Sequence, residues 1–168
     1  MTVQTATHIN GVDIVLRPIR DTDMPFLLEL YASTRAEEMA MIDWPDEQKD
    51  QFLATQFHAQ HTYYMENYLE ATFDVMIWQK EPIGRLYVEE WPTELRIIDI
   101  ALLPQYRKQG IGGYFMKKLM QRAQDGKKGV SIHVEKNNPA MRLYKRLGFK
   151  KVDEHGLYDL MGWRKNDK

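Results

Sequence analysis

The chain has 168 residues, a formal net charge of −1 and 43% hydrophobic residues. This length suits one domain over residues 1–168, large enough to bury a core without metal or disulfide support. The near-neutral charge argues against a dedicated nucleic-acid-binding protein, which would normally be basic. There is no run of about 18 apolar residues and the N-terminus is polar, so we expect no membrane span, no signal peptide and a cytoplasmic location.

The chain contains no cysteine, and its only serines are Ser33 and Ser131. Disulfides, thiolate nucleophiles and Cys-ligated zinc are therefore excluded. Neither serine lies in a G-x-S-x-G context, which argues against a serine hydrolase. His58-x-x-His61 lacks the H-E-x-x-H spacing and has no evident third ligand, so we predict no metal site.

The N-terminal part predicts one strand and two helices. Alternating branched residues predict a strand over 12–19. Apolar residues at helical spacing then predict a helix that starts near Asp23 and runs towards Ala40. Asp46 can cap a second helix that extends to about Tyr68.

The remainder predicts a strand meander, a crossover helix and a terminal hairpin. The three meander strands are expected at 72–78, 83–91 and 94–103. A helix over about 111–125 then connects to a strand at 130–135, which should pair in parallel with the last meander strand. A short helix begins at Asn137 and stops at Gly148, before the hairpin. These elements predict an α+β domain around a mixed sheet.

The glycine-rich turn between the last meander strand and its helix is a candidate anion site. It reads Arg107-Lys-Gln-Gly-Ile-Gly-Gly113. The first N–H groups of a helix lack intrahelical partners, and glycine lets an anion approach the bare backbone. The alternative is a tight strand-to-helix turn that simply requires glycine. The pattern matches neither G-x-x-x-x-G-K-[ST] nor G-x-G-x-x-G.

The spacing R-x-x-G-x-G over 107–112 resembles the acyl-CoA pyrophosphate loop of the GCN5-related N-acetyltransferase (GNAT) family. Downstream, Asn137-Asn-Pro-Ala-Met-Arg-Leu-Tyr-Lys-Arg-Leu-Gly-Phe149 is similar to that family's second motif, N-x-x-A-x-x-L-Y-x-x-x-G-F. The two motifs lie in the family's order and separation. The resemblance implies the GNAT fold: a mixed central sheet of six to seven strands flanked by about four helices, with a V-shaped splay between the fourth and fifth strands.

The resemblance also implies acetyl-CoA as the co-substrate. In this family the loop amides hold the pyrophosphate; here these would be Gln109, Gly110, Ile111, Gly112 and Gly113, with Arg107 and Lys108 assisting. Pantetheine would insert into the splay along Ile100, Ala101 and Leu102. The Leu102 N–H is the candidate to polarise the acetyl carbonyl. Asn137, or alternatively Asn138, would contact the pantetheine.

Tyr144 occupies the family's general-acid position and would also contact CoA. A phenol of pKa about 10 can protonate a departing thiolate of pKa about 8.5. The alternative is a core tyrosine on a helix face shared with Ala140 and Leu147. The implied reaction is direct attack by a primary amine of a small molecule or peptide in a ternary complex.

The general base is open. An amine of pKa about 10.4 is only about 0.04% neutral at pH 7, a handicap of roughly 4.6 kcal/mol. Arg96 stands where some relatives keep a catalytic Glu, and Asp99 would face the acceptor only if the strand contains a bulge. The other candidates are His133, Glu135, Glu89, Glu90 and a water chain.

Two rival functions remain at this level. One is a CoA-binding sensor or scaffold with the same fold and little or no turnover. The other is an unrelated nucleotide-phosphate binder. We expect no nucleic-acid or membrane partner, and a homodimer would be in keeping with the family.

Overall fold

The computed structural model describes residues 7–9 and 12–165. Residues 1–6, 10–11 and 166–168 of the single domain predicted over 1–168 lie outside this description. Within the described part, no helix is both long and apolar enough to cross a membrane.

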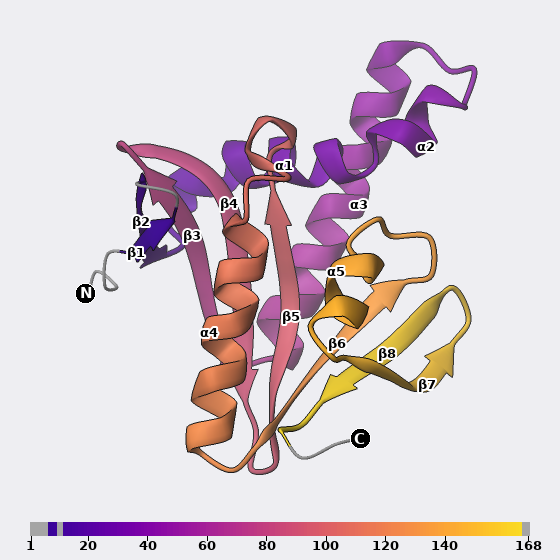
Figure 1. The fold of residues 1–168 in the computed structure, drawn as a ribbon. Coiled ribbons are helices and arrows are strands. Elements are labelled where there is room, and N and C mark those ends of the chain that lie inside the picture. The colour runs from indigo at the N-terminus through magenta and orange to yellow at the C-terminus, as the bar shows by residue number, and fades with distance from the viewer. Residues whose placement is uncertain (1–6, 10–11, 166–168) are drawn as a thin grey trace.

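A single mixed sheet organises the fold (Figure 1). Its strands are β1 (Thr7–Ile9), β2 (Val12–Pro18), β3 (Thr72–Trp78), β4 (Glu81–Glu90), β5 (Glu94–Leu102), β6 (Gly129–Glu135), β7 (Lys150–His155) and β8 (Tyr158–Trp163). The order across the sheet is β1-β2-β3-β4-β5-β6-β8-β7. Among the described strands, only β5 and β6 pair in parallel, as the crossover predicted. The described sheet has one strand more than expected, because the three-residue β1 is too short to give a recognisable alternation.

Helices cover both faces of this sheet (Figure 1). They are α1 (Met24–Thr34), α2 (Ala36–Ala40), α3 (Asp46–Asn67), α4 (Ile111–Asp125) and α5 (Met141–Arg146), with 3-10 turns η1 (Asp21–Asp23) and η2 (Pro104–Tyr106). The first predicted helix is broken at Arg35, whose φ is −108° and ψ is 3°. Asp46 begins α3 but does not cap it, since the N-cap position belongs to Pro45.

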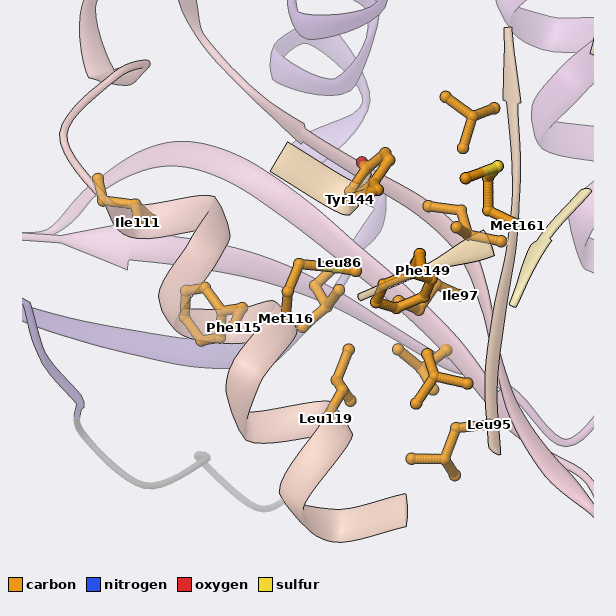
Figure 2. Close-up of a cluster of buried hydrophobic side chains, with 14 of the residues drawn as sticks. Leu86, Leu95, Ile97, Ile111, Phe115, Met116, Leu119, Tyr144, Phe149 and Met161 are labelled. Atoms are coloured by element: carbon orange, nitrogen blue, oxygen red, sulfur yellow. The ribbon is translucent and has the colours of Figure 1, made fainter. Parts of the chain in front are cut away.

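The main core lies between the sheet and α4. Ile111, Phe115, Met116 and Leu119 recur at helical spacing, so they form one apolar face that packs on the sheet (Figure 2). A second buried cluster lies under α1 and α3 and contains Leu27, Tyr31, Met39, Leu53 and Phe57. We call the side of the sheet under α4 and α5 the α4 face, and the side under α1 and α3 the α3 face.

The splay lies between β5 and β6. Their pairing runs from Glu94 opposite Gly129 to Ile97 opposite Ile132 and ends there. Both strands continue, β5 to Leu102 and β6 to Glu135, without pairing to each other. The predicted V between the fourth and fifth expected strands is therefore confirmed.

A bulge in β5 decides which residues face which side. Val88 pairs with Ile97 and Tyr87 with Asp99, so Ile98 is the extra residue. Before the bulge Ile97 points into the α4 core, and after it Ile100 does so. Because a bulge reverses the side-chain alternation, Asp99 lies on the α3 face together with Arg96.

Candidate active site

The glycine-rich loop presents bare backbone at the start of α4. Gly110 caps the helix with φ +86°, a left-handed conformation that glycine adopts without strain. The Tyr114 N–H donates to the Gly110 carbonyl at 3.0 Å, so the three preceding amides have no partner in the helix. A Cβ built on Gly112 would meet no atom within 4 Å. The loop therefore offers unpaired backbone amides and open space to an anion.

Backbone groups of β5 line the open side of the splay. The Leu103 N–H donates to the Ile83 carbonyl of β4 at 2.9 Å, which makes Leu102 and Gly84 a non-hydrogen-bonded pair. By alternation, the N–H and C=O of Leu102 and of Ile100 point away from β4 into the splay. Those of Ala101 point to β4, so a contact from Ala101 to a molecule in the splay can come only from its side chain.

Arg107 bridges the loop to α1. Its Nε donates to the Leu102 carbonyl at 2.9 Å, and its Nη2 donates to Ser33 Oγ at 3.3 Å. A contact from Arg107 to a pyrophosphate, as predicted, would therefore depend on the guanidinium N–H groups that these two hydrogen bonds leave unused. The side chain of the neighbouring Gln109 donates to the Gln105 carbonyl, while Lys108 has φ +61° and an exposed side chain.

The two asparagines before α5 differ in their contacts. Asn138 Oδ1 accepts a hydrogen bond from the Ala140 N–H at 2.8 Å, which fixes the turn into the helix. Both side chains are exposed. No described residue binds the side-chain amide of Asn137, whereas Asn138 uses its Oδ1 within the turn.

Tyr144 sits on α5 with 5% of its surface exposed and packs against Phe149. Burial and, second, the Asp99 carboxylate raise the pKa of Tyr144 to about 12. Tyr144 belongs to the core of the α4 face, whereas Asp99 lies on the α3 face. The opened splay therefore brings an aromatic hydroxyl and a carboxylate within electrostatic reach from opposite sides of the sheet.

Asp99 is held by one of its two oxygens. Oδ2 accepts hydrogen bonds from Arg85 Nη2 at 2.6 Å and from Tyr64 Oη at 2.9 Å. No described residue donates to Oδ1, and 17% of the side chain is exposed. The carboxylate is fixed in orientation and keeps one oxygen for a ligand.

A buried polar network stands behind Asp99. The Arg85 side chain is 3% exposed, donates to Gln60 Oε1 at 2.9 Å and stacks on the Tyr87 ring. Burial and then the Asp99 carboxylate raise the pKa of Tyr64, so its hydroxyl stays a neutral donor. The sequence interpretation missed Arg85 and Tyr64. The available signal was a single cation within the apolar strand Ile83-Gly-Arg-Leu-Tyr-Val88.

The other base candidates have partners of their own. His133 Nδ1 lies 3.4 Å from Arg96 Nη1, and burial, the Arg96 charge and His155 lower the pKa of His133. Glu135 Oε1 accepts a hydrogen bond from Arg35 Nη1 at 2.8 Å, which ties β6 to the α1–α2 junction.

The two glutamates at the end of β4 are also occupied. Glu89 accepts from the Trp91 indole N–H. Glu90 points to the α4 face, where Arg122 and Lys128 bind it. Within the described residues no group of three or more His, Asp or Glu side chains is arranged to hold a metal ion.

The sequence model described as "Acetyltransferase (GNAT) family" matches residues 28–149, most of the chain. The chain belongs to the GNAT acetyltransferase family. As a GNAT protein it is 37% identical over 98 residues to an N-alpha-acetyltransferase of Sulfurisphaera tokodaii, an alignment that covers 49% of this chain and 59% of that protein. It is 32% identical over 83 residues to a mycothiol acetyltransferase of Corynebacterium aurimucosum, covering 48% of this chain and 26% of the relative.

Solved structures share the fold. The PaiA N-acetyltransferase of Thermoplasma acidophilum, in complex with coenzyme A, superposes with a TM-score of 0.65 and 18% identity, covering 90% of this chain and 98% of that one. The alignments thus span about three fifths and one quarter of the two sequence relatives but nearly all of this structural neighbour.

Proposed function

We propose that this GNAT protein transfers the acetyl group of acetyl-CoA to a primary amine by direct attack in a ternary complex. Two features support the proposal: the bare amides at the start of α4 and the half-occupied carboxylate of Asp99 on the opposite face of the splay. The similarity to an N-alpha-acetyltransferase supports an amine acceptor.

The donor would be held on the α4 side. The amides of Gln109, Gly110, Ile111, Gly112 and Gly113 would bind the CoA pyrophosphate, assisted by Arg107 and Lys108. Ile100 and Leu102 would bind pantetheine through backbone groups, Ala101 through its side chain, and Asn137 or Asn138 through its amide. When bound, acetyl-CoA supplies the acetyl group as a thioester, which a neutral amine attacks.

The acceptor would approach from the α3 face, and Asp99 is the base we propose. Its free Oδ1 can accept the ammonium proton while Arg85 and Tyr64 hold Oδ2. Asp99 would take up this proton as the amine attacks, which lowers the barrier of the reaction step, while the roughly 4.6 kcal/mol needed to form the neutral amine at pH 7 is still required. His133 is a weaker candidate, because its Nδ1 lies against Arg96. Glu135 also keeps one oxygen that no described residue binds, but Asp99 is the carboxylate whose charge reaches Tyr144.

The Leu102 N–H and Tyr144 would act on different atoms of the thioester, the acetyl oxygen and the sulfur. The Leu102 N–H would donate to the acetyl oxygen as charge develops there. A phenol of pKa about 12 is a weaker acid than a thiol of about 8.5, so Tyr144 would chiefly donate a hydrogen bond to the leaving sulfur. The negative charge of Asp99 contributes to the raised pKa of Tyr144. When Asp99 takes up the proton of the acceptor, that contribution is lost, so Tyr144 becomes more acidic at the same time.

Release of free thiol from acetyl-CoA, measured against a panel of small amines and short peptides, tests the proposal. Acceptor-dependent thiol release is expected, with mass spectrometry showing an acetylated amine and no acetylated protein. Binding of acetyl-CoA without any acceptor-dependent thiol would favour a sensor or scaffold instead. Stronger thermal stabilisation by ATP or NAD than by CoA would overturn CoA as the ligand.

A further inference from the structure

Arg96 is a buried cation that the proposed reaction does not use. Its surface is 8% exposed. It pairs with Ser131, in the last but one β5–β6 pair before the splay opens. Its Nε donates to Ser131 Oγ at 2.8 Å, and its Nη1 lies 3.4 Å from His133 Nδ1. The Trp91 ring covers one face of the guanidinium, with 4.5 Å from Cζ to the ring centroid.

The hydrogen-bonding capacity of this guanidinium is only partly used. An arginine has five N–H donors, and the described residues engage one on Nε and one on Nη1. No carboxylate of the described residues forms an ion pair with Arg96 within 4.0 Å. A buried cation without a close counter-charge is costly, so an anionic ligand would be stabilised here.

The nearest carboxylates in the sheet do not replace such a ligand. Glu89 lies opposite Arg96 in the β4–β5 register, but it accepts hydrogen bonds from the Trp91 indole and from the Glu70 amide. Glu94 lies two residues before Arg96 on the same strand and forms no ion pair with it.

Arg96 shares the α3 face with Asp99 because of the bulge at Ile98. Asp99 lies three positions after Arg96 on the strand, which corresponds to roughly 7 to 10 Å between their Cα atoms. A carboxylate that could bind an amine and a guanidinium with unused donors therefore lie side by side on the face that the acceptor would approach.

His133 completes the surroundings of Arg96 as a neutral side chain. Arginine can only donate, so Nδ1 of His133 is the acceptor and Nε2 carries the proton. Burial, the Arg96 charge and His155 lower the pKa of His133, which keeps it neutral at pH 7. His155 itself pairs with Asp153 on β7. His133 can thus offer one further N–H without adding a charge.

We propose that Arg96, together with His133, forms a carboxylate-binding subsite on the α3 face, and that the acceptor is an amine that carries a carboxylate. The Trp91 ring covers one face of the guanidinium, and the N–H groups that Ser131 and His133 do not engage lie in its plane, where a carboxylate accepts hydrogen bonds. The inference rests on the proposed acetyl transfer to an amine, and it names the class of that amine.

Matched acceptors test it: ω-amino acids of three to six carbons against alkylamines of the same length. We expect the wild-type kcat/KM to favour the carboxylate-bearing member roughly 10- to 100-fold, the value of a charge-assisted hydrogen bond. Arg96→Met should bring this ratio close to one, mainly through KM, and Arg96→Lys should retain part of it. Arg122→Met is the control: it removes an exposed cation of α4 and should leave the ratio unchanged.

Calorimetric binding of the ω-amino acids to the CoA-saturated protein gives a readout independent of turnover. Wild type should bind them more tightly than Arg96→Met, and Arg122→Met should match wild type. A wild-type ratio near one, or a ratio unaltered in Arg96→Met, would overturn the subsite while leaving acetyl transfer intact. Failure of every amine to release thiol would overturn the proposed function, and the calorimetry would then decide the subsite by itself.

Discussion

Replacing Asp99 with Asn gives the sharpest test of the proposed base. The amide keeps an oxygen for Tyr64 but removes the charge that Arg85 meets at 2.6 Å. The Arg85 side chain is 3% exposed, so the variant buries an unpaired guanidinium. Breaking such a buried pair costs about 3 to 5 kcal/mol. For a domain of this size we expect Tm to fall by roughly 6 to 20 °C.

The kinetic effect should be of similar size in free energy and is measured separately from folding. Loss of a general base typically costs about 10²- to 10⁴-fold, and we expect kcat/KM at pH 7 to fall within this range. The residual rate should then rise about tenfold per pH unit towards the pKa of the amine, because only the small neutral fraction of the acceptor reacts. Thiol release between pH 6 and 10, measured below the lowered Tm, records both effects.

Asp74→Asn is the matched control. Asp74 is also buried, at 7% exposed, but it lies opposite Leu86 on the α4 face of the sheet. Burial raises the pKa of Asp74, so neutralising it should not harm folding at pH 7, and kcat/KM should stay near wild type. A folded Asp99→Asn protein that binds CoA and keeps the wild-type rate and pH profile would refute the assignment of the base.

Three further changes probe the neighbouring groups. Tyr144→Phe should lower kcat more than it lowers the affinity for CoA. In urea unfolding, the wild type should also lose up to about 2.7 kcal/mol of stability relative to this variant between pH 10 and 12. The reason is that the tyrosine ionises at a lower pH in the unfolded chain than in the folded one. Equal pH dependence of the two proteins would contradict the raised pKa. Gly112→Ala should weaken CoA binding measured by calorimetry with little change in Tm, since its Cβ meets no protein atom within 4 Å; unchanged affinity would exclude the pyrophosphate from this position. Tyr64→Phe removes one hydrogen bond to Asp99 and should lower kcat/KM about 10- to 100-fold, whereas Tyr63→Phe, at a side chain 55% exposed, should not; equal effects would exclude a positioning role.

Most of the fold could be predicted from the sequence, because its signals are local. Helix α4 and strands β3 to β6 followed from hydrophobic periodicity, and the positive φ of Gly110 and Gly148 followed from their places at helix ends. The errors lie where local signals are weak. β1 has three residues, and the break at Arg35 accompanies an ion pair to Glu135, a hundred residues away.

The candidate site divides in the same way. The sequence by itself determined the proposed donor side, because a glycine-rich turn sets its own backbone conformation locally and its R-x-x-G-x-G spacing resembles the pyrophosphate loop of the family. Only the tertiary structure decided where the residues of the proposed acceptor side lie. The bulge at Ile98 turns Asp99 to the α3 face, and the partners that orient it, Arg85 and Tyr64, come from 14 and 35 residues away in the chain. Such contacts depend on strand register and helix packing, which a local pattern does not encode.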